Sequence, residues 1–157
     1  MTTDMTQRHY DRRRMLQAGS ALALVPWLPA RAAESDIAEI PALAAFLAGR
    51  SPRWERIRLE LPPLADNGQA VPMKIVVAGP FAPGPYVTAL RLFSQRNPVP
   101  EIASFEFPVA VERVEVESRI RLAGTQRVVA VATLSDGALY AAGAEVVVTI
   151  DACMDGT

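Results

Sequence analysis

The chain has 157 residues, half of them hydrophobic, and its 16 Lys and Arg residues nearly balance its 17 Asp and Glu residues. It has one cysteine, Cys153, so a disulfide framework and a multi-cysteine zinc site are excluded. The charge balance gives no indication of nucleic-acid binding, and no apolar run approaches the roughly 18 residues of a membrane span. These counts predict a single globular domain with little side-chain chemistry.

The N-terminal residues follow the order of features of an export signal. Arg12 and Arg13 form a twin arginine, a moderately apolar stretch covers residues 18–28, and small residues precede a cut after Ala32. This order predicts a twin-arginine signal peptide over residues 1–32 and a periplasmic location. The alternative is a basic N-terminus that stays in the cytoplasm.

Removal of the signal peptide would leave 11 basic and 15 acidic residues and would remove His9, the one histidine. Imidazole acid–base catalysis and histidine metal ligation are then excluded in the exported form. Cys153 would be unpaired in an oxidising compartment, where a free thiol calls for an explanation.

Residues 35–49 have apolar side chains at helical spacing, and Pro41 is acceptable only near the start of a helix. We therefore predict a helix from about residue 40 to Gly49 within an N-terminal segment, residues 33–52. The helix is expected to cover one end of the core. A docking helix for a partner is the alternative.

Beyond Arg50 the apolar period changes to two, which is typical of strands. The alternation is clearest over residues 113–122, where apolar side chains alternate with charged ones. About six or seven short strands with almost no helix between them predict an all-β, immunoglobulin-like antiparallel β-sandwich over residues 53–150. A parallel sheet would need crossover helices, for which there is no room. The expected strands cover residues 57–61, 73–77, 86–93, 113–122, 126–134 and 145–150.

Residues 151–157 form a short tail beyond the last expected strand, and we expect it to be a flexible arm. No base lies next to Cys153 in the sequence to activate its thiol. Asp151, Asp155 and the terminal carboxylate all disfavour the thiolate. Such a thiol suits a carrier that is activated only inside a partner's site, and an idle cysteine is the alternative.

Several segments of the chain resemble a known protein family in combination. They are residues 61–68 with Val71 and Pro72, residues 97–100 with Phe105 and Phe107, residues 118–123 and 126–132, Asp136 with Gly137, and residues 144–150. Over about residues 55–153 the chain resembles SoxY, the sulfur-carrier subunit of the bacterial Sox system for thiosulfate oxidation. A twin-arginine signal also fits this family.

The resemblance implies a carrier, not an enzyme, that forms a heterodimer with an immunoglobulin-like SoxZ subunit. It implies that sulfur intermediates are bound covalently to a cysteine near the C-terminus, a role that only Cys153 can take here. The implied partners are a haem enzyme that couples thiosulfate to the cysteine, a hydrolase that releases sulfate, and a sulfane dehydrogenase. No cofactor is implied on the carrier itself, because haem and metal belong to the partners.

The tail departs from the family pattern, since SoxY proteins typically have glycines on both sides of the cysteine. Here Asp151, Met154 and Asp155 lie close to Cys153 in the sequence, and the one glycine of residues 151–157 is Gly156. Side chains make the arm thicker, and the aspartates repel anionic thiosulfate. The partners' channels could be altered, or the chain could carry a different sulfur species. A third reading is a binding or assembly module with a non-functional cysteine.

Three other groups are better explained by structure than by chemistry. Residues 66–68 resemble half of a calcium loop but lack the further carboxylates, so a turn is predicted. Four arginines among glutamates are expected to form cross-strand ion pairs instead of an anion-binding stripe. Three aromatic residues are expected in the core or at a subunit interface. The arginines are Arg113, Arg119, Arg121 and Arg127, and the aromatic residues are Trp54, Phe105 and Phe107.

Overall fold

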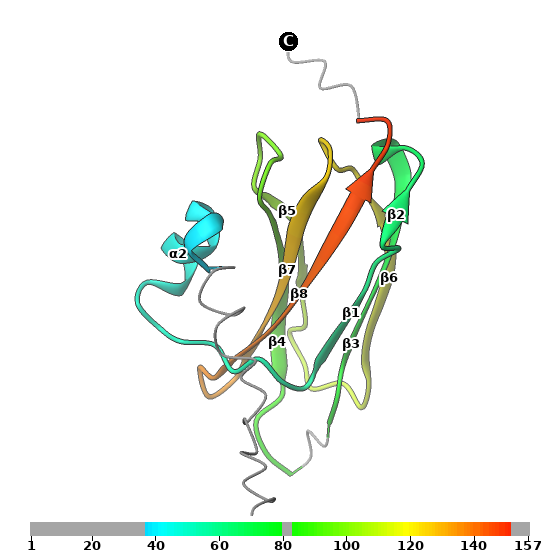
Figure 1. Ribbon diagram of the computed structural model, residues 1–157. Helices are drawn as coiled ribbons and strands as arrows, with labels where there is room; N and C mark the ends of the chain where they lie inside the picture. Colours follow the sequence, from blue (N-terminus) through cyan, green and yellow to red (C-terminus); the bar gives the residue numbers. More distant parts are fainter. Residues whose placement is uncertain (1–36, 80–82, 152–157) are drawn as a thin grey trace, which may run out of the picture.

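The structure is a computed structural model that describes residues 37–79 and 83–151. Two β-sheets pack face to face, and a short helix lies outside the larger one (Figure 1). The three-stranded sheet has the order β1 (Ile57–Glu60), β3 (Val71–Val77) and β6 (Val114–Ile120). The five-stranded sheet has the order β2 (Leu64–Ala65), β8 (Leu139–Val148), β7 (Gln126–Leu134), β4 (Val87–Ser94) and β5 (Glu101–Glu106).

The predicted all-β antiparallel sandwich with a short N-terminal helix is confirmed, with one local exception. All strand pairs are antiparallel except β2 with β8, which are parallel, with Leu64 opposite Val147 and Ala65 opposite Val148. The expectation that no parallel pairing occurs was therefore wrong at this point. A crossover helix is needed only between strands joined by a direct connection. The connection from β2 to β8 is most of the domain.

The inner core lies between the two sheets and is built from alternate residues of facing strands. Val71, Met73, Ile75 and Val77 of β3 are buried, whereas the intervening residues are exposed or half-buried. The opposing sheet contributes buried side chains from every second residue, including Leu90 and Leu92 of β4 and Val128 and Ala130 of β7. Period-two alternation therefore marks the dry face of each sheet.

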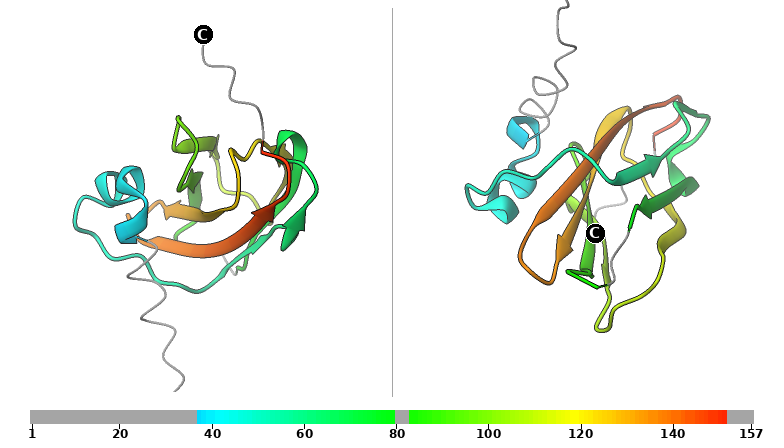
Figure 2. Two further views of the ribbon diagram at one scale, coloured as in Figure 1. Left: turned by 45° about the horizontal axis from the view of Figure 1, so that its top comes forward. Right: turned by 90° about the horizontal axis from the view of Figure 1, so that it is seen from below.

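The helix α2 (Pro41–Leu47) covers the outer face of the five-stranded sheet (Figure 2). Leu43 and Leu47 pack against Phe93, Val129 and Val131, which point away from the inner core. The predicted extent of the helix is confirmed, but the expectation that it covers one end of the core was wrong. The reason lies in β7, which is apolar on both faces and needs cover on each side.

The docking of α2 gives a testable prediction. Leu43 is fully buried, so Leu43→Ala should lower the free energy of unfolding in urea by about 2–5 kcal/mol. Ala45→Gln, at an exposed position of the same helix, is the control and should change stability by less than about 0.7 kcal/mol. Equal effects of the two substitutions would mean that α2 does not pack on the sheet.

The largest departures from the expected strands concern β2, β5 and β8. β2 and β5 were not predicted, and β8 begins at Leu139, six residues before the expected strand that was placed at residues 145–150. A tight turn brings the chain from β7 directly into β8, with Gly137 at φ 84° and the Ala138 N–H donating to Asp136 Oδ1 (2.9 Å).

No helix in the described part of the chain is long and apolar enough to cross a membrane.

Candidate functional site

Three residues were named from the sequence as functional: Cys153 in the tail, and Arg12 and Arg13 in the expected export signal. All three lie outside the described residues. The structure does describe the chain up to Asp151, two residues before Cys153. We call residues 147–151 the arm root, because the tail that carries Cys153 starts from them. The arm root is the part of the candidate site that lies within the described residues.

One side of the arm root is held by the segment around β2. The N–H groups of Val147, Thr149 and Ile150 donate to the carbonyls of Pro63 (3.0 Å), Ala65 (3.0 Å) and Asp66 (3.2 Å). The Gly68 N–H donates to the carbonyl of Ile150 (2.8 Å), and the Thr149 hydroxyl donates to the carbonyl of Asp66 (2.6 Å). The backbone is therefore fixed as far as Ile150, beyond the end of β8.

The other side of the arm root contacts the loop before β7. The Val148 N–H donates to Thr125 Oγ1 (3.0 Å). Gly124 has φ 137°, and a Cβ at this position would lie 2.9 Å from Asp151 Oδ1, so the loop approaches the Asp151 carboxylate closely. Because the chain is fixed through Ile150, three residues of backbone place the Cys153 Cα within about 11 Å of the Ile150 Cα.

A pair of side-chain amides fixes this loop. Asn97 Oδ1 accepts from the Ala123 N–H (3.0 Å) and from Gln126 Nε2 (2.9 Å), and Asn97 Nδ2 donates to the carbonyl of Arg121 (2.8 Å). Gln126 is 2% exposed, and its Nε2 also donates to the carbonyl of Gly124 (3.2 Å). The amide pair thus satisfies buried polar groups and holds the loop against the arm root.

Removal of one member of the pair should loosen the loop. Asn97→Ala is expected to lower the free energy of unfolding by about 1–3 kcal/mol, because the Ala123 N–H and the Arg121 carbonyl lose their partner. Hydrogen exchange at the Ala123 amide should also become faster. Gln69→Ala, at an exposed position near the arm root, is the control. Unchanged protection of the Ala123 amide in Asn97→Ala would contradict the prediction.

Apolar side chains surround the point where the tail leaves the fold. Leu64 is 55% exposed, Val147 45% and Ile150 66%, and Leu64 and Val147 are direct neighbours in the parallel register. Large apolar side chains exposed together are uncommon away from contact sites. A protein that reaches Cys153 must approach this surface, because the cysteine is tethered close to it.

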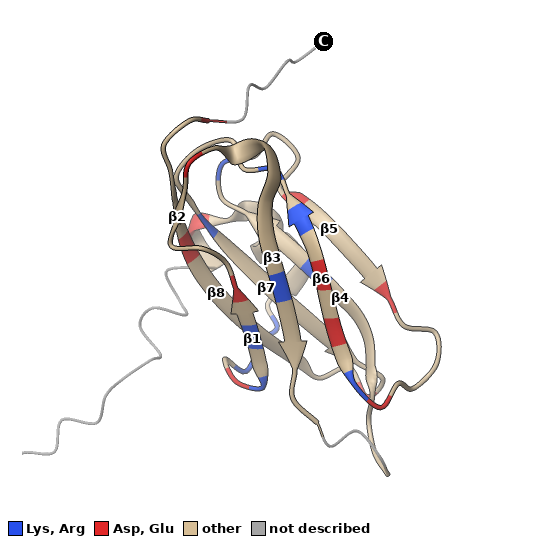
Figure 3. Cartoon of the chain, turned by 90° about the vertical axis from the view of Figure 1, so that its right-hand side faces the viewer, with Lys and Arg blue, Asp and Glu red and all other residues tan. Residues whose placement is uncertain are grey.

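The outer face of the three-stranded sheet has interleaved charges (Figure 3). Lys74 Nζ lies 2.6 Å from Glu115 Oε1 and 2.6 Å from Glu117 Oε1, and Arg113 pairs with Glu115. The hydrogen bond from Lys74 lowers the pKa of Glu115, and the bonds to the two glutamates raise the pKa of Lys74. This part of the face is therefore internally neutralised.

The four arginines expected in ion pairs behave differently from one another. Arg113 pairs with Glu115, two residues away in the same strand segment, and so does not form the predicted cross-strand pair. Arg119 and Arg121 are exposed and form no ion pair among the described residues. Arg127 lies in the other sheet, opposite Glu145 in the register of β7 and β8. The predicted cross-strand pairing was thus wrong for Arg113, Arg119 and Arg121. On this face Lys74 of β3 forms the cross-strand pairs, with Glu115 and Glu117 of β6.

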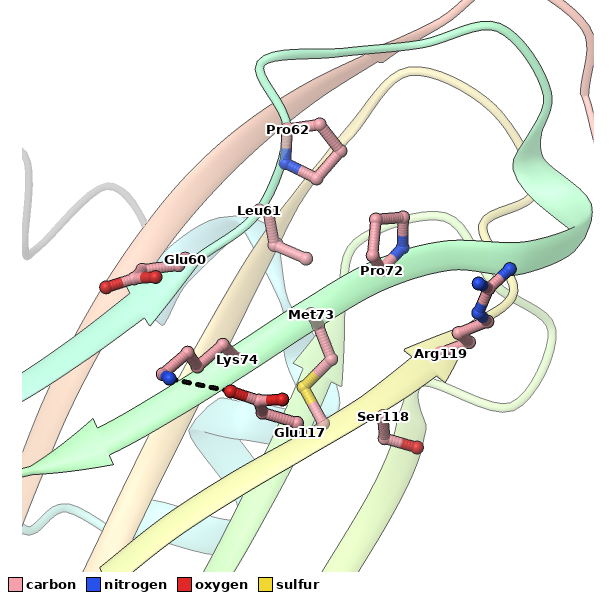
Figure 4. A pocket seen from close by; sticks show the side chains of 9 residues that line it. All are labelled: Glu60, Leu61, Pro62, Pro72, Met73, Lys74, Glu117, Ser118 and Arg119. Atoms are coloured by element: carbon pink, nitrogen blue, oxygen red, sulfur yellow. Dashed lines mark hydrogen bonds and ion pairs between the residues drawn. The ribbon is translucent and has the colours of Figure 1, made fainter.

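A hollow of about 610 Å³ lies beside Lys74 on this face (Figure 4). Glu60, Pro72 and Glu117 contribute to its wall, and the dashed contact in the figure joins Lys74 to Glu117. Within the described ranges, no group of three or more His, Cys, Asp or Glu side chains could hold a metal ion. Lys74, the one lysine that lines the hollow, is engaged in ion pairs with Glu115 and Glu117, and Arg119 also lines the hollow.

Two of the structural explanations from the sequence are confirmed. Asn67 Oδ1 accepts from the Gln69 N–H (2.6 Å) and caps the short 3-10 helix η1 (Gly68–Ala70), so residues 66–68 form a turn. Trp54 packs on the apolar cluster under α2, and Phe105 and Phe107 pack on the inner core.

Comparison with known proteins identifies the family. The chain matches the family described as "Sulfur oxidation protein SoxY" over residues 43–153. It belongs to the SoxY family. The match includes the whole arm root and reaches Cys153. No curated protein sequence matches the chain.

A solved structure agrees with this assignment. The sulfur carrier protein SoxY from Chlorobium limicola f thiosulfatophilum is 28% identical, with a TM-score of 0.58, over 74% of this chain and 96% of that one. A candidate superoxide reductase from Thermotoga maritima is 16% identical, with a TM-score of 0.50, over 60% of this chain and 87% of that one. The second likeness shows a shared fold alone.

Several of the segments by which the sequence resembles SoxY meet at the arm root. Residues 61–68 supply the carbonyls that bind residues 147–150, and Asn97 and Gln126 fix the neighbouring loop. No sequence pattern marked this amide pair, Thr125, Gly124 or Thr149 as parts of the site. Asn97 lay within a SoxY-like segment, and that was the one signal that pointed to it.

Proposed function

We propose that this SoxY family member is a periplasmic sulfur carrier that holds sulfur intermediates covalently on Cys153 and presents them to partner enzymes. The observation that carries the proposal is the arm root. The fold fixes the chain through Ile150 at the end built from SoxY-like segments, and the family match continues to the lone cysteine three residues later. The chain acts as a substrate-bearing subunit and not as an enzyme.

The chemistry proposed for Cys153 is a disulfide-type linkage to sulfur. The thiol sulfur bonds to the outer sulfur of thiosulfate, the thiol proton passes to solvent, and two electrons pass to the haem enzyme as oxidant. Water then cleaves the bond between the sulfane and sulfonate sulfurs, in the site of the hydrolase. Sulfate and a proton are released, and a persulfide remains on Cys153 as the substrate of the sulfane dehydrogenase.

The short tether explains how several enzymes could use one carrier. Cys153 can move only about 11 Å from the Ile150 Cα, so each enzyme must bring its active-site channel over the arm root. Leu64, Val147 and Ile150 form the exposed apolar surface that its rim would meet there. A SoxZ-like subunit is proposed as the stable partner in a heterodimer.

Intact-mass spectrometry tests the proposal. The exported chain, purified with the SoxZ-like subunit of the same bacterium, is incubated with thiosulfate and the haem enzyme, and the adduct is located by peptide mapping. We expect one adduct, on Cys153. SoxY from Chlorobium limicola, treated in the same way with its own partners, is the positive control.

The same experiment separates the proposal from its rivals. An unmodified chain, under conditions that load the control, would overturn the carrier function for thiosulfate and favour a binding module with an idle cysteine. Repeating the incubation with sulfide or sulfite examines the alternative of a different cargo. The second arm of the test is motivated by the tail, which has aspartates and a methionine near Cys153 where SoxY proteins typically have glycines.

A further inference from the structure

We propose that the open side of the sandwich between β5 and β6 is the docking site of the stable partner subunit. The partner would supply an extended segment that pairs with the free edge of β5, places apolar side chains in the groove and directs carboxylates toward Arg119 and Arg121. This inference rests on the proposed function, because it assumes that the carrier has a stable partner. It concerns a surface that the arm root does not include.

The two sheets leave unpaired edges on one side of the molecule. β5 ends the five-stranded sheet and β6 ends the three-stranded sheet, and no described strand pairs with their outer edges. On the opposite side β1 lies against β8, and β2 extends the sheet beyond β8. Exposed edges are usually protected by charged residues or proline; β5 has charged residues only at its two ends, Glu101 and Glu106, and neither charge nor proline between them. The edge of β5 is thus able to accept a strand.

A groove of about 550 Å³ follows this open side. Val99, Ile102, Ala103 and Ile120 contribute its apolar lining, and Val99 is 69% exposed. An added strand presents side chains alternately to the two faces of the sheet, so every second residue of the partner segment would point toward this lining. The lining explains why the partner segment should alternate apolar with polar residues.

The rim of the groove on β6 is positively charged. Arg119 and Arg121 line the groove and are exposed, and neither forms an ion pair among the described residues. Lys74 and Arg113 on the same sheet differ from these two arginines, because both are paired with glutamates. Two adjacent unpaired guanidinium groups match carboxylates of a partner, because arginine binds carboxylates in a bidentate manner.

A second copy of this chain is a poor fit for the same edge. Antiparallel self-pairing of β5 about its centre would place Glu101 opposite Glu106 of the other copy at both ends. Like charges directly opposite one another destabilise a strand pair. The single Arg91, which contacts both glutamates at 2.9 and 3.7 Å, balances only one of their two charges within each copy.

The location of the groove also fits a partner that stays bound while the enzymes bind and dissociate in turn. The arm root must remain open to each enzyme in turn, so a stable subunit needs a different surface. Asn97 lines the groove and also fixes the loop beside the arm root. A subunit seated in the groove would therefore adjoin the arm without covering it.

Binding of the SoxZ-like subunit of the same bacterium to the full exported chain tests the proposal, measured by calorimetry. We expect the double variant Arg119→Glu/Arg121→Glu to raise Kd at least tenfold. Arg119→Lys/Arg121→Lys should raise Kd by less than the charge-reversed variant, since lysine keeps the charge but loses the bidentate geometry of the guanidinium group. Arg58→Glu, which reverses an exposed charge on the distant β1 edge, should leave Kd unchanged. In the wild-type complex, the amides of residues 101–106 should gain protection from hydrogen exchange.

Several results would overturn the proposal. An unchanged Kd for the charge-reversed variant, or no binding to the wild-type chain, would do so. So would a dimer of this chain formed through β5. The proposal would also fail if the amides of residues 101–106 were protected from hydrogen exchange in the chain alone and this protection were lost in Asp155→Asn. The last result would assign the groove to the chain's own tail. Loading of Cys153 is measured separately, so a chain that is loaded but binds its partner elsewhere refutes only the docking site. A chain that docks as described but is never loaded refutes only the carrier function.

Discussion

Replacement of Cys153 by alanine is expected to abolish thiosulfate-dependent turnover in a system reconstituted with all partner enzymes. The chain has no other cysteine, and no other side chain can form the sulfur–sulfur bond on which the proposed cycle depends. We expect turnover to fall to the level measured without the carrier. Cys153→Ser should be equally inactive, because a hydroxyl cannot form a persulfide.

Met154→Ala is the matched control for this loss. It shortens the side chain next to Cys153 without removing the thiol, so turnover should persist, and thermal unfolding should be the same for all three variants. Turnover that survives in Cys153→Ala would refute the carrier mechanism outright. It would leave the chain as a binding or assembly module whose cysteine is idle.

The fold was predictable where side-chain patterns record which face of an element is dry. The alternation over residues 113–122 predicted β6, and Val114 and Ile120 are buried as expected. The run over residues 126–134 is apolar on both faces, and β7 is indeed central in its sheet and covered by α2. When one face of a strand or helix is buried, its apolar residues recur at a regular spacing in the sequence.

The missed strands have no such trace. β2 pairs through two residues, which is too short for any period, and it follows Pro62 and Pro63. β5 has exposed Ser104 and Glu106 next to half-buried neighbours, so its contrast is weak. The first half of β8 is rich in alanine and glycine and owes its burial partly to α2 on the other side.

The candidate site was predictable only in part, for a similar reason. Cys153 stands out because the chain has so little other chemistry. The arm root depends on hydrogen bonds between residues far apart in sequence, such as Thr149 with Asp66 and Asn97 with Gln126. No local pattern encodes a contact between residues 83 positions apart, so only the fold brings these groups together.

The second large effect is expected on the export that the N-terminal sequence predicts. Conversion of both Arg12 and Arg13 to lysine should reduce the amount of chain in the periplasm at least tenfold, because the twin-arginine receptor reads the guanidinium pair and not charge alone. Immunoblots of periplasmic and cytoplasmic fractions measure this ratio. The exported wild-type chain should begin at Ala33, as shown by its intact mass.

Arg8→Lys is the matched control, since it changes a basic residue of the same N-terminal region outside the pair. Its periplasmic fraction should equal that of the wild-type chain. Equal export of the double variant would exclude the twin-arginine route. A carrier that remained in the cytoplasm would also lie in a reducing compartment, where its thiol needs no protection from oxidation. The location of the chain therefore decides which oxidants and partners can reach Cys153.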